Sequence, residues 1–120
     1  MPSTVQADLS TPDLDRALAF YTQLFGAVET SRVPEAGPIF YLGLRIGDSD
    51  LGLVTNTEVE VGEPVRVLLS IMVDDADRVA ALVAGAGGQV LGPANDMPWG
   101  QRVAHVLDPD GNMVNLTQDL

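Results

Sequence analysis

The amino-acid sequence predicts an α+β fold made of two tandem βαβββ modules, and three observations lead to this prediction. The two halves of the 120-residue chain align without a gap when the sequence is shifted against itself by 62 positions. Short segments alternate apolar and polar residues, as half-buried strands do, and one segment in each half has apolar residues at helical spacing. The aligned identities favour a true repeat over chance because they fall at corresponding places in the two halves. They are Pro2/Pro64, Val5/Val67, Asp13/Asp75, Asp15/Asp77, Arg16/Arg78, Gly26/Gly88, Val28/Val90, Asp48/Asp110 and Thr55/Thr117.

The first half begins with residues 5–10, where apolar and polar residues alternate as in a half-buried strand. A helix is expected next, with Thr11 as its N-cap, Pro12 at its first position and acidic residues in its first turn. Gly26 is expected to end this helix in the left-handed conformation. The residues expected on its buried side are Leu14, Ala17, Leu18, Tyr21, Leu24 and Phe25. Three further strands are expected at 27–33, 39–46 and 51–55.

The second half repeats this order after a polar linker at residues 56–64. The glycine run at 85–88 should end its helix, and the Pro and Gly of the segment 108–112 indicate a structural turn. The expected elements are a strand at 66–73, a helix at 75–86, and strands at 89–91, 101–107 and 112–117.

The length of the chain is typical of one domain. We therefore expect a single domain over 1–120, with module one at 1–58 and module two at 63–120.

Alternation along the strands also assigns side chains to the two faces of each predicted sheet. In the last strand, Val114 and Leu116 should pack under a helix, which leaves Asn115 on the opposite face. In the strand at 66–73, Val67 should face inward and Leu68 should face the other way. Each half then has one apolar sheet face and one mixed face, and a ligand pocket is expected on the mixed face.

The composition excludes several classes of partner and chemistry. Seventeen acidic residues against six basic ones give a formal net charge of -11, which repels nucleic acids and anionic membranes. This charge either serves solubility or attracts a cationic ligand. The absence of Cys excludes disulfides, thiolate metal ligands and a cysteine nucleophile. Because the sequence shows no membrane-spanning stretch and no signal-peptide pattern, we expect a cytoplasmic protein without membrane contact.

Two segments carry a resemblance to a known superfamily. Residues 13–26, DLDRALAFYTQLFG, resemble the first-helix signature of the vicinal oxygen chelate proteins, which include glyoxalase I, extradiol dioxygenases and bleomycin-resistance proteins. Residues 98–112, PWGQRVAHVLDPDGN, resemble the loop, strand and turn that lead into the last strand of those proteins. The resemblance implies two modules that form a curled mixed sheet around a cavity, and it implies a homodimer.

The resemblance also implies four metal-ligand positions, one on the first and one on the last strand of each module. Carried over by the 62-residue register, they fall on Gln6, Leu53, Leu68 and Asn115. Two Leu side chains remove half of such a ligand shell, and neutral amides are weak donors. We therefore expect no metal and no cofactor at these positions. Superfamily members without the metal resemble proteins that bind and sequester an antibiotic.

The remaining candidate residues each have a structural alternative. Trp99 lies in an irregular loop and could stack on a planar or cationic ligand, or pack to hold the loop. His105 is the only His, and a structural role is favoured over catalysis because no motif pairs it with a nucleophile. Asp8 should look into the pocket, where Arg45, beside Tyr41 on the mixed face, is its expected partner. An Asp8 without that partner would favour a cationic ligand.

We therefore predict that the chain binds a small organic molecule in a cavity without metal chemistry, with cationic or aromatic antibiotics as candidates. The alternative is a metal-dependent lyase, isomerase or dioxygenase with an unorthodox ligand set of Gln6, Asp8, His105 and Asn115. A third interpretation is a domain that binds a protein partner. No residue is assigned a catalytic role. The predicted ligand-binding residues are Gln6, Asp8, Tyr41, Leu53, Leu68, Trp99, His105 and Asn115.

Overall fold

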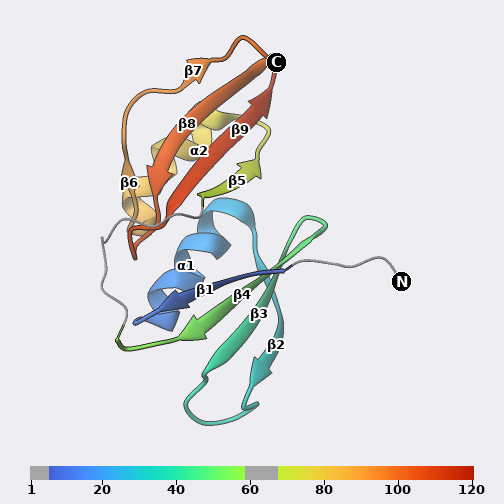
Figure 1. The fold of residues 1–120 in the computed structure, drawn as a ribbon, viewed down its shortest axis with the longest axis vertical. Helices are drawn as coiled ribbons and strands as arrows, with labels where there is room; N and C mark the ends of the chain where they lie inside the picture. Colours follow the sequence, from blue (N-terminus) through green and yellow to red (C-terminus); the bar gives the residue numbers. More distant parts are fainter. Residues whose placement is uncertain (1–5, 59–67) are drawn as a thin grey trace. The chain divides into compact units, whose positions relative to one another are not determined.

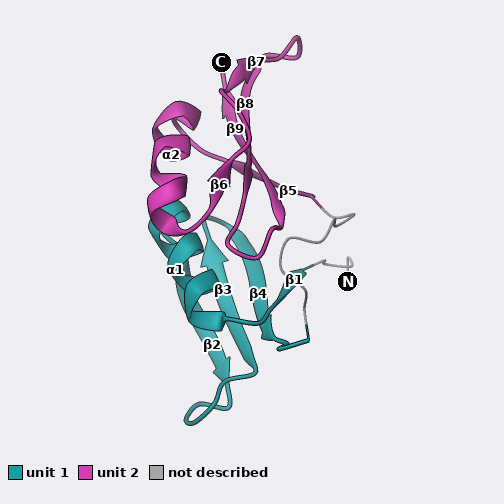
Figure 2. Ribbon diagram, turned by 90° about the vertical axis from the view of Figure 1, so that its left-hand side faces the viewer, with its two compact units in different colours: residues 1–59 teal, residues 60–120 magenta. Residues whose placement is uncertain are grey.

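The computed structural model describes residues 6–58 and 68–120. The chain divides into two compact units, residues 1–59 and 60–120, and the boundary falls in the predicted linker (Figure 2). The expected matches at Pro2/Pro64 and Val5/Val67, and the inward orientation of Val67, lie outside the described residues. That the two units form a single domain stays a prediction.

Unit one contains one helix and a four-stranded sheet (Figure 1). Its elements are β1 (Ala7–Thr11), α1 (Leu14–Phe25), β2 (Val28–Val33), β3 (Tyr41–Ile46) and β4 (Ser49–Thr55). The strand order is β1-β4-β3-β2, with β1 parallel to β4 and the other neighbours antiparallel. The predicted βαβββ order is confirmed in this unit.

Unit two has the same order with one added short strand. Its elements are β5 (Leu68–Met72), α2 (Ala76–Val83), the 3-10 turn η1 (Ala84–Ala86), β6 (Gln89–Val90), β7 (Asn95–Asp96), β8 (Gln101–Leu107) and β9 (Met113–Asp119). The strand order is β5-β9-β8-β6, and β7 also pairs with β8. The α+β fold class of two tandem modules is confirmed. Strand β7 lies between the predicted strands at 89–91 and 101–107, where the sequence predicts no strand. No helix in the described parts of the chain is long and apolar enough to cross a membrane.

Equivalent aspartates cap the two helices. Asp13, not Thr11, is the N-cap of α1, and its side chain accepts a hydrogen bond from the Arg16 backbone N–H at 3.1 Å. Thr11 instead ends β1, and its hydroxyl accepts from the Asp13 backbone N–H. Asp75 caps α2 through the same contact to the Arg78 backbone N–H. The predicted helix end at Gly26 is confirmed, with φ of 65°.

Each sheet buries one face and leaves the other open. In unit two, Val114 and Leu116 are fully buried together with Val83 of α2, which confirms the predicted inward face. In unit one, α1 contacts β4, and its residues Phe20 and Tyr21 are fully buried. The buried sheet residues of this unit are Leu42, Leu44, Leu51 and Leu53. We call the opposite side of each sheet its open face.

The 62-residue register ends at the turn before the last strand of each unit. In unit one, Gly43 pairs with Gly52, and a two-residue turn joins β3 to β4. In unit two, His105 pairs with Asn115, and residues 108–112 form a longer turn. His105 lies 62 positions after Gly43, but Asn115 lies 63 positions after Gly52. The structural equivalent of Asn115 is therefore Gly52, one residue before the position that the gapless alignment predicts.

Asp108 organises the longer turn. Its Oδ1 accepts hydrogen bonds from the backbone N–H groups of Asp110 at 2.9 Å and Asn112 at 2.8 Å. Its Oδ2 accepts from the Asn112 side-chain amide at 2.9 Å. Gly111 supplies the positive φ of 87° that the turn requires. These contacts give the segment the structural role that its Pro and Gly indicated.

Two glycines leave the middle of the open face of unit one without side chains. The cross-strand register places Asp8, Gly52, Gly43 and Ser31 in one row across the four strands. A Cβ atom at Gly52 would overlap the Asp8 carboxylate and would lie 2.9 Å from Cε1 of Tyr41. A Cβ at Gly43 would lie 2.6 Å from the Ser31 hydroxyl. The glycines therefore leave room for longer side chains to lie across the sheet.

The equivalent caps predict equivalent losses of stability. Asp13→Ala and Asp75→Ala should each lower the free energy of unfolding by about 1 kcal/mol, because each leaves a helix N–H group without its side-chain acceptor. Urea denaturation measures both, and Asp48→Ala, in an exposed turn, is the charge-matched control. A loss no larger than that of the control would contradict the assigned caps.

The close approach over Gly52 predicts energetic coupling with Asp8. Gly52→Ala should be more destabilising in the natural sequence than in an Asp8→Ala background, by about 1 kcal/mol, because the added methyl group meets the carboxylate. Thermal or urea unfolding of the four proteins of this double-mutant cycle gives the coupling. Gly85→Ala, where an added Cβ meets nothing within 4 Å, is the control. Additive effects of the two substitutions would show that the contact is absent.

Candidate functional site

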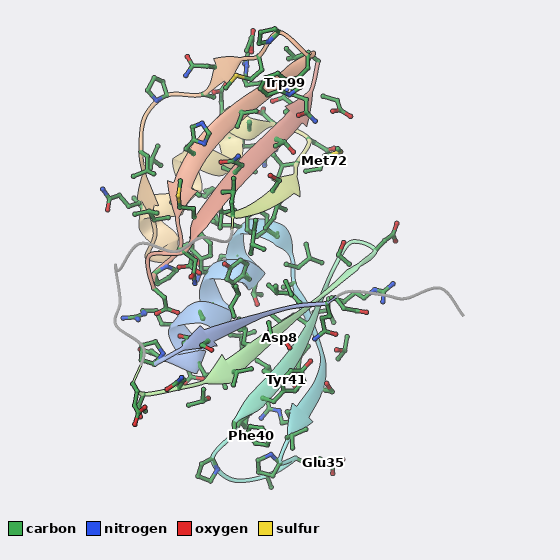
Figure 3. The ribbon with its side chains drawn as sticks, in the orientation of Figure 1. Asp8, Glu35, Phe40, Tyr41, Met72 and Trp99 are labelled. Carbon is green, nitrogen blue, oxygen red and sulfur yellow. The ribbon has the colours of Figure 1, made fainter. Side chains whose placement is uncertain are left out.

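Three of the predicted site residues come together on the open face of unit one. The side-chain amide of Gln6 donates hydrogen bonds to Oδ1 of Asp8 and to the hydroxyl oxygen of Tyr41, both at 2.8 Å. Figure 3 shows Asp8 on β1 and Tyr41 on β3 beside each other. We call these three residues the Asp8 cluster. Sequence reasoning missed the two glycines beneath it, although paired glycines inside strands were a usable signal.

The expected partner of Asp8 bonds elsewhere. Arg45 lies opposite Asp50 in the β3–β4 pair, and its Nη1 is 3.0 Å from Oδ1 of Asp50. The predicted Asp8–Arg45 pair is therefore wrong, because the hairpin brings a nearer carboxylate to the guanidinium. Among the residues that the structure describes, no cation forms an ion pair with Asp8. Its carboxylate is exposed on the open face with the neutral Gln6 amide as its donor.

Leu53 is not on the open face, and its predicted placement there is wrong. It is 0% exposed and pairs with Leu42 and Leu9 on the side of the sheet that α1 covers. The reason is that the segment from Gly43 to its partner Gly52 is one residue shorter than the segment from His105 to its partner Asn115, which places Gly52 on the open face instead. A ligand lying on that face could not reach the Leu53 side chain.

His105 and Asn115 face each other across β8 and β9 on the open face of unit two. The His105 Nδ1 and the Asn115 Oδ1 are 2.6 Å apart. His105 also lines a pocket of about 480 Å3, together with residues of the segment after β6 and one residue of β9. The lining residues are Leu91, Gly92, Pro93, Asn95, His105 and Met113. Leu68, 46% exposed, pairs with Met113 at the edge of this region.

An arginine holds one wall of this pocket in place. Arg102 of β8 makes ion pairs with Asp96 of β7 at 2.7 Å and with Asp77 of α2 at 2.8 Å. The hydrogen bond from Arg102 lowers the pKa of the Asp96 carboxyl below its ordinary value. The neighbouring Asn95 lines the pocket, so the Arg102 contacts fix β7 where it contributes to the site.

Trp99 lies in the turn between β7 and β8 (Figure 3) and is not among the residues that line the pocket. Its indole N–H donates to Oε1 of Gln101 at 3.0 Å, but its side chain is not in a core, since the residue is 67% exposed. The hydrogen bond anchors the ring to its own hairpin, and the ring faces stay open to stacking.

The donor set does not fit the metal site that the resemblance implies. With the corrected register, the four positions are Gln6, Gly52, Leu68 and Asn115. Gly52 has no side chain and Leu68 carries no donor atom, so only two neutral amides are left. In the described parts, 6–58 and 68–120, no three residues among His, Cys, Asp and Glu gather as a metal site would require.

Comparisons with known proteins agree with this fold. Residues 4–116 match the model of the Glyoxalase/Bleomycin resistance protein/Dioxygenase superfamily. The "Putative glyoxylase CFP32" of Mycobacterium tuberculosis is 36% identical over 104 residues, which are 87% of this chain and 39% of that protein. The chain thus spans about two fifths of that relative.

Two further proteins are similar over nearly all of the chain. The "Probable lactoylglutathione lyase" of Vibrio parahaemolyticus is 31% identical over 121 residues, covering 92% of this chain and 86% of that protein. The structure of a bleomycin resistance determinant encoded on the transposon Tn5 has a TM-score of 0.71 and 20% identity, over 98% of both chains, and shares the fold. The match over residues 4–116 shows that this chain belongs to the Glyoxalase/Bleomycin resistance protein/Dioxygenase superfamily.

Proposed function

We propose that this protein binds a small organic molecule with a cationic group and does not change it covalently. The observation that carries the proposal is the Asp8 carboxylate, which is exposed on the open face of unit one while Arg45 pairs with Asp50. Because the donor to Asp8 is the neutral Gln6 amide, the carboxylate can bind a cation without first breaking an ion pair.

The surroundings of Asp8 suit such a ligand. A charge-assisted hydrogen bond from an ammonium or guanidinium group to the carboxylate is stronger than a neutral one. The Tyr41 ring lies close to Asp8 above Gly52 and offers a face for a cation–π or stacking contact. The formal net charge of -11 raises the local concentration of cationic molecules.

The superfamily supports a binding role as well as an enzymatic one. Its description includes bleomycin resistance proteins, and a bleomycin resistance determinant shares the fold of this chain. We therefore include cationic and aromatic antibiotics among the ligands proposed. The cytoplasmic location and the homodimer predicted from the sequence belong to the same proposal.

Removing the charge of Asp8 tests the proposal. Asp8→Asn should weaken binding of a cationic glycopeptide such as bleomycin about tenfold in calorimetric titration, because the charge-assisted contact is lost while the shape is kept. Asp48→Asn makes the same change of charge in an exposed turn of the same unit and should have little effect. Equal affinities of the two variants, or no heat with any cationic or aromatic antibiotic, would refute the proposal.

A second candidate function is a metal-dependent lyase, isomerase or dioxygenase, which the names of two relatives favour. Of the ligands predicted for it, Gln6 and Asp8 are hydrogen-bonded within unit one, and His105 and Asn115 are in contact within unit two. We assign the metal of this hypothesis to the unit-two pair, because that pair contains the imidazole. This hypothesis predicts one divalent ion per chain in protein purified without chelators, and the loss of that ion in His105→Ala. Elemental analysis measures both quantities. A metal content well below one ion per chain, unaffected by the substitution, would exclude this set.

A further inference from the structure

The pocket of unit two contains an oriented histidine that cation binding at Asp8 does not use. The Asn115 Oδ1 lies 2.6 Å from the His105 Nδ1. We assign the ring proton to Nδ1, because the Asn115 carbonyl oxygen that faces this nitrogen only accepts hydrogen bonds. In the neutral ring, Nε2 is then an unprotonated acceptor.

The strand order turns this acceptor toward the pocket. Strand β8, which carries His105, lies between β9 and β6. Asn115 contacts the ring from the β9 side, whereas the pocket wall at residues 91–95 lies on the other side of β8. The ring edge opposite Nδ1, which includes Nε2, is therefore turned toward that wall. The Leu91 backbone N–H donates to the His105 carbonyl oxygen at 2.9 Å, which keeps wall and ring together.

The other pocket groups suit a largely apolar ligand. Leu91 and Met113 are 47% and 37% exposed, so covering them removes apolar surface from water. Asn95 donates from its side-chain amide to the Pro93 carbonyl oxygen at 3.3 Å, which leaves its own Oδ1 as a second acceptor. This open pocket of about 480 Å3 therefore offers apolar walls and two hydrogen-bond acceptors to a ligand.

We propose that this pocket binds a flat, mainly apolar group with a hydrogen-bond donor, such as a phenol, and that the His105 Nε2 accepts the hydrogen bond. Asn115 acts as a positioning residue, because it fixes which ring nitrogen carries the proton. The inference rests on the proposed small-molecule binding and adds the chemistry of one contact, and it does not require Asp8.

Phenol and anisole are the matched probes, since they share the ring and differ in the donor. Titration of the full chain, followed by NMR signals of His105 and the Met113 methyl group, should give millimolar binding of phenol, as its few atoms allow. Anisole should bind about fivefold more weakly, which is the usual effect of one hydrogen bond. Equal binding of the two probes, or no shift of the pocket signals with either, would overturn the proposal.

Two variants separate the acceptor from the shape of the pocket. His105→Phe keeps a ring without the acceptor and should make phenol and anisole bind equally. Asn115→Leu should reduce the preference for phenol and give a mixture of ring tautomers, which the imidazole nitrogen signals report directly. A preference for phenol that persists in His105→Phe would overturn the role of His105.

Two further measurements distinguish failure of the pocket proposal from failure of the cation-binding proposal. In the natural sequence, the imidazole nitrogen signals should show Nε2 unprotonated, and a proton on Nε2 would overturn the proposal without any variant. Asp8→Asn should leave the preference for phenol unchanged. If bleomycin binding depends on Asp8 while phenol shifts no pocket signal, the pocket proposal fails and the cation proposal stands.

Discussion

The structure depends on the strict alternation of side chains along strands that are paired in fixed register. Because one face of each sheet is buried against a helix, each residue of β4 or β9 is committed either to the core or to the open face. One additional residue between the paired positions of β8 and β9 therefore changes which side chains lie on the open face. This is why Leu53 lies in the core while Asn115, its partner in the gapless alignment, lies on the open face.

The same row of each sheet carries different chemistry in the two units. In unit one the row contains Asp8 at the edge and two central glycines, so the carboxylate has room to lie across the sheet. In unit two the equivalent positions are Ser70, Asn115 and His105, so the central strands themselves carry the functional groups. The repeated module thus presents a carboxylate on the open face of unit one and a neutral hydrogen-bonding pair on the open face of unit two.

Ion pairing within each unit determines which charges a ligand can use. Arg32 pairs with Glu29, Arg45 pairs with Asp50, and Arg102 pairs with two carboxylates. These are short-range contacts within one hairpin or between adjacent elements, and at exposed sites they add little stability. For the proposed function the contact that matters is the Arg45–Asp50 pair, because Arg45 was the expected partner of Asp8.

The sequence by itself determined the fold class, the order of the helices and the longer strands, the helix end at Gly26 and the inward face of β9. These features follow from local conformational preference and from hydrophobic period, both of which are present in consecutive residues. Alternation along the strands also predicted that Gln6, Asp8 and Tyr41 share one face, and that His105 and Asn115 share a face in the other unit. Only the tertiary structure decided the partner of Arg45, the burial of Leu53 and the glycines under the Asp8 cluster. Those features depend on how many residues each turn contains and on which strands become neighbours, and pairing between distant segments leaves no periodic signal in the chain.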